Sequence, residues 1–350
     1  MRLMKAALAL LAVASAVTFA GSAAAARITV SPGESIQAAV DAASPGDTIV
    51  VEAGTYNQNV LVAKDRIALV GRGAVLETPV AEPACVDPSA PDVLNGICVF
   101  GEVDDQGNIV DSVLGVTVAG FTVKNFGGTG IIASGAAGAT FANNVTGENG
   151  EYGIAAFAST GTKIVGNVTY GSEEAGIYVG DSPNANTLVL GNDTYDNLFG
   201  IFQRNALGLT IDLNKVHGNC IGMLVLADAP GPAGAMRARA NHVVDNTKAC
   251  PGIEEVGFPP TSGIGFLLLG ANDVKITANL ITGNVPSGPT AFSGGVVVTT
   301  GVAGTPPSSI TVSHNVIRHN DPDLFWDETG SSISFTANRC QTSVPSGLCS

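Results

Sequence analysis

A six-residue phrase that begins with asparagine recurs seven times between residues 144 and 320. Its copies read NVTGEN, NVTYGS, NDTYDN, NKVHGN, NHVVDN, NLITGN and NVIRHN. The first Asn stands at 144, 167, 192, 214, 241, 279 and 315, so four steps span 22–27 residues and two longer steps carry insertions. The alignment extends back to Phe121 and forward to Asn338. A period of this length predicts a solenoid of stacked coils.

Within the phrase, the side chains follow one pattern. A second Asn closes six of the copies, and Ser172 is the exception. Two residues after the first Asn stands a β-branched residue, namely Thr146, Thr169, Thr194, Val216, Val243, Ile281 and Ile317. Three residues before it stands an apolar residue, namely Phe141, Ile164, Val189, Ile211, Ala238, Ile276 and Val312. Because neighbouring strand residues point to opposite faces, we expect both sets to point into the solenoid.

The asparagines are expected to mark the corners of the coils. Identical residues stack about 4.8 Å apart on successive coils, so their amides can exchange hydrogen bonds. Asn side chains also satisfy backbone groups at bends. We therefore interpret the Asn-x-Thr triplets at Asn144, Asn167 and Asn192 as parts of a structural ladder and not as glycosylation sites.

This pattern resembles the right-handed parallel β-helix proteins, the architecture of pectate lyases and of carbohydrate-binding and sugar-hydrolase β-helices. The resemblance covers roughly residues 28–340 and implies an all-β, single-stranded right-handed parallel β-helix (solenoid) with an N-terminal helical cap. The stretch GESIQAAVDAASPGDTIVVEAGTYNQNVLV (33–62) resembles the opening of pectinesterases and related exported β-helices. The stretch NDPDLFWDETGSSISFTANRCQTSVPSGLC (320–349) resembles the closing segment of many uncharacterised members.

The resemblance does not bring an active site with it. The catalytic motifs of pectinesterases, pectate lyases, polygalacturonases and alginate epimerases are missing, and NDPDL (320–324) is not the Asp-Pro-His of the epimerases. Since one fold hosts many functions, a site has to be argued from the outward-facing residues themselves.

Outward positions of the phrase gather polar and aromatic side chains on the middle coils. One row is expected to stack Asp193, Lys215 and His242, and a second row Tyr170, Tyr195 and His217. Tyr195, Lys215 and His217 are the candidate catalytic residues, because β-elimination of a uronic acid needs a base and a proton donor. Tyr170, Asp193 and His242 are candidate ligand-binding residues beside a sugar stacked on tyrosine. A metal held by Asp193, His217 and His242 is a weaker alternative. The interpretation without a ligand is a solvated lateral face on which neighbouring side chains pair across the strands.

A second outward row follows a recurring Gly-apolar pair. It comprises Ile132, Ala155, Tyr178, Phe202, Leu224, Leu267, Val297 and Trp326. An apolar row of this length is not expected to face water, so we expect loops 226–237, 247–262 and 284–293 to cover it. The alternative is a ligand-binding surface centred on Tyr178, Phe202 and Arg204. Trp326 is expected to pack near the C-terminal end.

The N-terminal residues indicate the localisation of the protein, and its net charge limits its partners. Residues 1–26 have the pattern of a signal peptide, with Arg2 and Lys5 before an apolar stretch and small residues before residue 27. We therefore expect a secreted protein with one β-helix domain over 27–350 and no membrane span. Without Arg2 and Lys5, 14 basic side chains face 30 acidic ones, a formal charge of −16. This charge argues against nucleic acid as a partner.

Six cysteines in an exported chain predict disulfides, and six allow 15 pairings. Pairing between near neighbours gives Cys85–Cys98, Cys220–Cys250 and Cys340–Cys349, and the last would pin the C-terminal cap. A metal site is the alternative, but the sequence has no Cys-x-x-Cys pair.

The acidic stretch 101–112 contains Glu102, Asp104, Asp105 and Asp111. Calcium prefers such oxygens, although a turn with solvated acids explains them as well. We otherwise expect no cofactor. The favoured function is engagement of extracellular or cell-surface polysaccharide through a lateral face, by a protein that is expected to be a monomer. The alternatives are an active polysaccharide lyase or hydrolase and a non-catalytic structural or adhesive surface protein.

Overall fold

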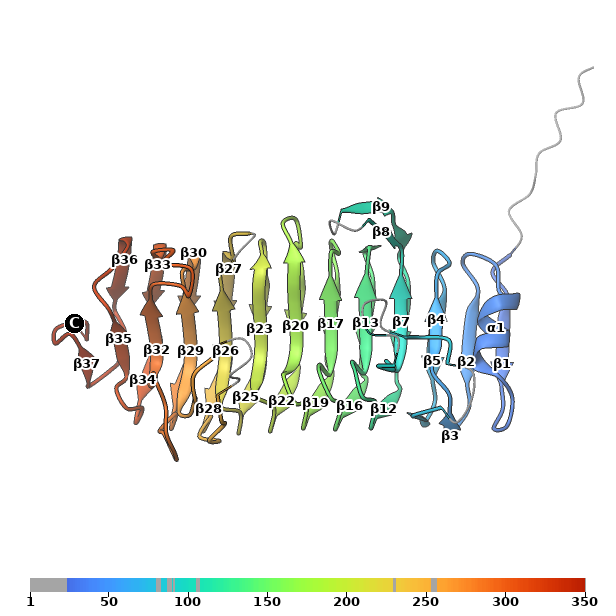
Figure 1. Cartoon of the computed structure of the whole chain (residues 1–350), viewed down its shortest axis with the longest axis horizontal. Coiled ribbons are helices and arrows are strands. Elements are labelled where there is room, and N and C mark those ends of the chain that lie inside the picture. The colour runs from blue at the N-terminus through green and yellow to red at the C-terminus, as the bar shows by residue number, and fades with distance from the viewer. Residues whose placement is uncertain are drawn as a thin grey trace, which may run out of the picture.

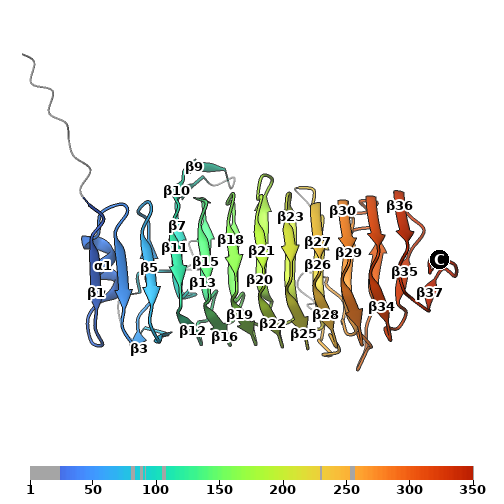
Figure 2. The ribbon, with the colours of Figure 1, turned by 180° about the vertical axis from the view of Figure 1, so that it is seen from behind.

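The computed structural model describes residues 24–79, 83–86, 90, 92–104, 108–228, 231–252 and 257–349. They wind as an elongated solenoid whose coils stack from one end to the other (Figures 1 and 2). A regular coil contributes one strand to each of three parallel sheets. The expected parallel solenoid is confirmed. The expected signal peptide at 1–26 lies almost entirely outside the described residues and stays a prediction.

Two of the sheets are joined by tight corners. The first has twelve strands, in the order β1 (Arg27–Val30), β2 (Thr48–Val51), β5 (Ala68–Gly71), β11 (Thr117–Ala119), β15 (Thr140–Ala142), β18 (Lys163–Val165), β21 (Leu188–Leu190), β24 (Thr210–Asp212), β27 (Gly234–Arg239), β30 (Asn272–Thr277), β33 (Ser308–Ser313) and β36 (Ser331–Thr336). The second has ten, in the order β3 (Gly54–Asn57), β6 (Ala74–Glu77), β12 (Thr122–Lys124), β16 (Val145–Gly147), β19 (Val168–Tyr170), β22 (Asp193–Tyr195), β25 (Lys215–His217), β28 (His242–Val244), β31 (Leu280–Thr282) and β34 (Val316–Arg318).

The third sheet has longer strands on its middle coils. Its eleven strands follow the order β4 (Val60–Val62), β7 (Ile97–Phe100), β13 (Ile131–Ser134), β17 (Ile154–Phe157), β20 (Ala175–Ser182), β23 (Phe199–Ala206), β26 (Ile221–Leu226), β29 (Ile264–Leu269), β32 (Gly294–Thr299), β35 (Leu324–Trp326) and β37 (Ser343–Val344). Outside the three sheets, β8 (Glu102–Val103) and β9 (Ile109–Asp111) form an antiparallel hairpin, and β10 (Val113–Leu114) pairs with β14 (Ala136–Ala137).

The interior has the alternation that the phrase predicts. Both inward-pointing sets, from Phe141 to Val312 and from Thr146 to Ile317, are at most 1% exposed. Burying one large apolar side chain contributes about 1.5–3 kcal/mol. Because every regular coil repeats these positions, the core runs as one continuous cluster along the solenoid.

The asparagines form two buried columns. The first column contains Asn144, Asn167, Asn192, Asn214, Asn241, Asn279, Asn315 and Asn338. From Asn167 onward, each side-chain oxygen accepts from both the backbone N–H and the side-chain N–H of the Asn one coil earlier, whereas the oxygen of Asn144 accepts from the backbone N–H of Phe121. The second contains Asn197, Asn219, Asn246, Asn284 and Asn320. The predicted ladders are confirmed.

Ser172 interrupts the second column, as the sequence predicts. Its backbone N–H still donates to Asn197, but among the described residues the Ser172 hydroxyl and the Asn149 side-chain nitrogen have no hydrogen-bond partner. At the other end, Asp323 accepts both N–H groups of Asn320 with one oxygen and backbone N–H groups of 341–342 with the other. The column therefore ends on a carboxylate that fixes the C-terminal segment.

Each corner pairs a left-handed residue with a ladder Asn. The φ angle is 65° at Gly166, but it is also 59° at Leu213 and 54° at Ala240. A residue other than glycine pays about 1–2 kcal/mol for this conformation. The ladder hydrogen bonds offset this strain, which is why the corners tolerate side chains.

The second apolar row is buried, as the loop-covered interpretation predicts. Tyr178 is 0% exposed and Phe202 is 6% exposed. Phe258 and Phe292, from loops 247–262 and 284–293, pack against this second core. An open binding surface centred on Tyr178 and Phe202 is therefore wrong. The row also differs at one position, because Phe325 pairs with Val297.

Trp326 accordingly points into the main core and not outward. Its ring packs near Phe335, with the centroids 6.3 Å apart, and its indole N–H donates to the backbone oxygen of Thr329. The expected packing role near the C-terminal end is confirmed.

The three predicted disulfides are all present: Cys85–Cys98, Cys220–Cys250 and Cys340–Cys349. At the N-terminal end of the solenoid (Figure 1), α1 (Ile36–Ala42) buries Ile36 and Val40 in the main core. Its role as a cap stays a prediction. Within the described ranges, no helix has the length and apolar character needed to cross a membrane.

Replacing Asn214 with Ala is expected to lower the free energy of unfolding by about 3 kcal/mol. The change leaves the backbone N–H of Asn192 buried without a partner, at about 1–3 kcal/mol, and it removes the side-chain hydrogen bonds to Asn192, Val189 and Asn241. Urea unfolding measures the effect. Asn57→Ala, an exposed position on β3, serves as the control and should shift stability by less than about 0.5 kcal/mol. Equal effects of the two changes would show that the ladder adds no stability.

Replacing Leu213 with Gly is expected to raise the free energy of unfolding by about 0.5–1 kcal/mol, since glycine adopts a positive φ without strain. The side chain is 64% exposed, so little packing is lost. Thr210→Gly, at an exposed position of β24, the strand that leads into this corner, should instead destabilise the protein. A destabilised Leu213→Gly protein would contradict the assignment of strain to this corner.

Alkaline pH is expected to destabilise the protein through Tyr178. Burial, together with the charge of Asp181, raises the pKa of the Tyr178 phenol above its ordinary value. Above about pH 10 the unfolded chain loses this proton while the folded protein keeps it, so stability falls as the pH rises. In urea unfolding between pH 8 and pH 11, Tyr178→Phe should lose less stability than the unchanged protein. Parallel pH profiles would contradict this assignment.

Candidate functional site

The predicted aromatic row exists on the outer face of the second sheet. Tyr170 pairs with Tyr195, and Tyr195 pairs with His217, in parallel register. The ring centroids are 5.5 Å and 5.2 Å apart, with interplanar angles of 10° and 21°. Gly147 precedes them on the same row, and a Cβ there would lie 2.3 Å from Cζ of Tyr170. A glycine at this position therefore gives the Tyr170 ring room to lie over the neighbouring coil.

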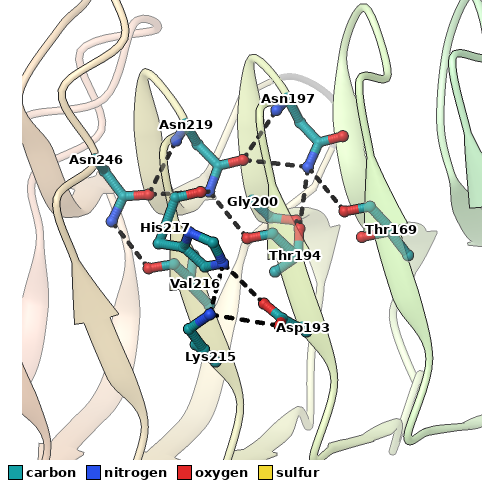
Figure 3. A network of polar contacts seen from close by, with 10 residues as sticks. All are labelled: Thr169, Asp193, Thr194, Asn197, Gly200, Lys215, Val216, His217, Asn219 and Asn246. Atoms are coloured by element: carbon teal, nitrogen blue, oxygen red, sulfur yellow. Dashed lines mark hydrogen bonds and ion pairs between the residues drawn. The ribbon is translucent and has the colours of Figure 1, made fainter.

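Asp193, Lys215 and His217 form one contact network beside this row (Figure 3). Nε2 of His217 lies 2.9 Å from Oδ1 of Asp193 and 3.0 Å from Nζ of Lys215. Nζ of Lys215 lies 3.5 Å from Oδ2 of Asp193. One ring nitrogen cannot donate to the carboxylate and accept from the ammonium group at the same time. The proton on His217 therefore decides which of its two contacts is a hydrogen bond.

The structure thus brings together Tyr195, Lys215 and His217, the candidate catalytic residues, with Tyr170 and Asp193. His242 is exposed and follows Lys215 in register. The charged groups of this network pair with one another at the solvent-exposed surface, where one such pair contributes about 0–1 kcal/mol to stability. Within the described ranges, no three His, Cys, Asp or Glu residues converge to hold a metal ion, so the metal alternative gains no support. A catalytic role stays a prediction.

The β8–β9 hairpin stands at the edge of the solenoid opposite the second sheet, beyond the ends of β7 and β13 (Figure 1). A cleft that the sequence did not reveal lies between this hairpin and the ends of the following coils. Its volume is about 600 Å³, inside the range of about 300–1,000 Å³ typical of ligand pockets. The hairpin contributes Val103, Asn108 and Ile109, and the ends of successive coils contribute Ser134, Phe157, Ser159, Thr160, Asp181, Ser182, Asn184, Asn205, Gly231 and Pro232.

Two carboxylates lie at this cleft or directly behind it: Asp181 lines the cleft, and Asp228 holds Asn205, which also lines it. Nε and Nη2 of Arg204 each lie 3.0 Å from Oδ2 of Asp228. Asn205 donates its side-chain N–H to the same carboxylate, and its side-chain oxygen accepts from the backbone N–H of Asp228. Asp181 accepts a long hydrogen bond, 3.4 Å, from the hydroxyl of Tyr178. Burial lowers the pKa of Arg204, but the hydrogen bonds and charge interactions with Asp228 and Tyr178 together outweigh burial and raise the pKa, so the guanidinium stays charged.

None of the candidate site residues selected from the sequence lines the cleft. Arg204, which the sequence placed beside Tyr178 and Phe202, precedes the lining residue Asn205 on β23. A sequence signal for the cleft exists in hindsight. Strands β20 and β23 have eight residues each, and both carry a polar pair at or next to their last residue, Asp181-Ser182 and Arg204-Asn205. Asp181 and Asn205 have φ angles of 50° and 46°. Polar left-handed residues at the ends of two long neighbouring strands mark an irregular edge.

The acidic stretch 101–112 is the hairpin itself. Glu102 and Asp111 are cross-strand partners, and Asp104 accepts hydrogen bonds from Asn108. Asp105 lies outside the described residues. The calcium hypothesis therefore stays untested.

Comparison with known proteins identifies the fold. The family model described as right handed beta helix region matches residues 106–301. A comparison with curated proteins found no match. Among solved structures, the chain is similar to the mannuronan C-5 epimerase AlgE6 A-module of Azotobacter vinelandii, with 18% identity, a TM-score of 0.50, and coverage of 88% of this chain and 95% of that one.

Two further structures are similar at lower identity. DFA-IIIase from Arthrobacter chlorophenolicus A6, in complex with GF2, has 13% identity, a TM-score of 0.52 and coverage of 85% of each chain. XylC, in complex with xylose, has 10% identity, a TM-score of 0.56, and coverage of 89% of this chain and 70% of that one. At these identities the likeness concerns the fold. With the family match over more than half of its length, the chain belongs to the right-handed parallel β-helix family.

Proposed function

We propose that this protein is exported and binds a segment of an extracellular or cell-surface polysaccharide in the cleft beneath the β8–β9 hairpin. The observation that carries the proposal is the composition of the cleft. Phe157 and Ile109 offer apolar surface, and Asp181 and Asn184 offer hydrogen-bonding groups. A sugar ring needs both, because its C–H face packs on an aromatic ring while its hydroxyls seek polar partners.

The rigidity of the cleft wall supports binding. The ring of Phe157 is fixed by Tyr152 and Tyr178, whose ring centroids lie 5.9 Å and 4.7 Å away. Asp228 fixes Arg204 and Asn205. Side chains that are already ordered in the folded protein lose little conformational freedom when a ligand binds, so binding costs less free energy. The similar structure of XylC, which holds xylose, agrees with a sugar as the class of ligand.

The cleft favours binding over hydrolysis. Glycoside hydrolases generally use two carboxyl groups on either side of the scissile bond. Among the described residues that line the cleft, Asp181 alone carries a carboxyl group. A lyase that uses Tyr195, Lys215 and His217 is the second candidate, since the structure brings these three residues together.

Phe157→Ala is expected to weaken the binding of polysaccharide about tenfold, and Asn184→Ala, at an exposed turn, several-fold. The reason is the loss of an aromatic face and of a hydrogen-bonding group. Affinity electrophoresis in gels that contain cellulose derivatives, xylan, pectin or alginate measures retention. Tyr195→Ala on the second sheet is the matched control and should leave retention unchanged. If Tyr195→Ala abolishes retention while both cleft variants bind normally, the flat face is the site.

The same polysaccharides, assayed for unsaturated products and new reducing ends, test the enzyme alternative. We expect no cleavage. Cleavage that Lys215→Ala or His217→Ala abolishes would establish the lyase alternative and place its chemistry on the second sheet.

A further inference from the structure

The charges around the cleft indicate which class of sugar it would bind. We infer that the cleft selects neutral saccharides over saccharides of uronic acids, and that Asp181 enforces this selection. The inference rests on the proposed function, because it assumes that the cleft binds sugar.

Asp181 brings a negative charge to the mouth of the cleft. It stands near the end of β20 with an exposed side chain, and its backbone is left-handed. Within the described part of the chain, its carboxylate accepts one hydrogen bond, the 3.4 Å contact from the hydroxyl of Tyr178. Most of its lone pairs therefore remain available. Sugar hydroxyls that donate to a carboxylate make charge-assisted hydrogen bonds, which are about twice as strong as neutral ones.

The nearest cation does not cancel this charge. Arg204 also contacts the Tyr178 side chain, but both of its ion-pair contacts run to Oδ2 of Asp228, so its charge is matched by that carboxylate. The remaining described residues of the cleft lining are neutral, with amides, hydroxyls and apolar side chains and no Lys or Arg. The chain as a whole carries 30 acidic and 16 basic residues. A uronate in the cleft would thus meet a like charge without a partner.

Like charges a few ångströms apart near a protein surface repel by enough to change affinity about tenfold or more. A carboxylate that accepts from neutral hydroxyls has the opposite effect. One side chain therefore attracts one class of sugar and repels the other, and this double action makes the inference testable with a single substitution.

The experiment measures binding of cellohexaose, xylohexaose, hexagalacturonate and hexamannuronate by calorimetry, with EDTA present so that no cation bridges the carboxylates. We expect the tighter neutral hexasaccharide to bind at least tenfold more strongly than either uronate. Asp181→Asn keeps the shape and tolerates the left-handed backbone. It should weaken neutral binding and strengthen uronate binding, so that the ratio of affinities falls about tenfold or more.

Asp196→Asn is the matched control, because Asp196 is likewise exposed and left-handed, with a φ angle of 59°, and the change removes one negative charge from the corner after β22, at the opposite edge of the solenoid. It should leave the ratio unchanged. If uronates bind as tightly as neutral sugars, or if Asp181→Asn leaves the ratio unchanged, the inference is wrong while the proposed function survives. If none of the four probes binds and no polysaccharide is retained in the gels, the proposed function itself fails.

Discussion

Hydrogen bonding between buried asparagine side chains is the interaction on which this structure depends. A corner between two strands interrupts the sheet ladder, so its backbone groups would be buried without partners, at a cost of about 1–3 kcal/mol each. Each ladder Asn supplies an acceptor to the backbone of the coil before it, as Asn214 does for Asn192, and a donor to that coil's carbonyl groups. The amide columns thereby fix the vertical register, and a residue's distance from its ladder Asn decides its place in the solenoid.

That register explains both the rows and their limits. Tyr170, Tyr195 and His217 stack because each stands three residues after a ladder Asn. A regular stack, however, builds a flat wall. The cleft arises where regularity is lost, at the hairpin 102–111 and at the ends of the long strands β20 and β23. Within this fold, the repeat supplies stability, and the departures from the repeat supply concave surface.

The same contrast decides what the sequence could predict. Inward positions, ladders and disulfide partners depend on local spacing, and all were predicted correctly. Trp326 was placed one residue out of register because the marker glycine is absent from its coil, where Asp323 takes the place that Gly295 holds one coil earlier. The cleft was missed because Ile109 and Asp181 are brought together by a hairpin that folds back over later coils, and no period in the sequence encodes that approach.

The two polar clusters contain similar carboxylates, but their neighbours leave different ones available to a ligand. On the second sheet, Asp193 and Lys215 contact each other and His217, so a ligand would have to compete with contacts already made in water. At the cleft, Asp228 holds Arg204 and Asn205, and Asp181 is left facing the open volume. Because Asp228 pairs with Arg204, the negative charge of Asp181 is left without a cationic partner in the part of the chain that the structure describes and can act on a ligand. Binding strength depends less on the number of charges than on which of them remain uncommitted after folding.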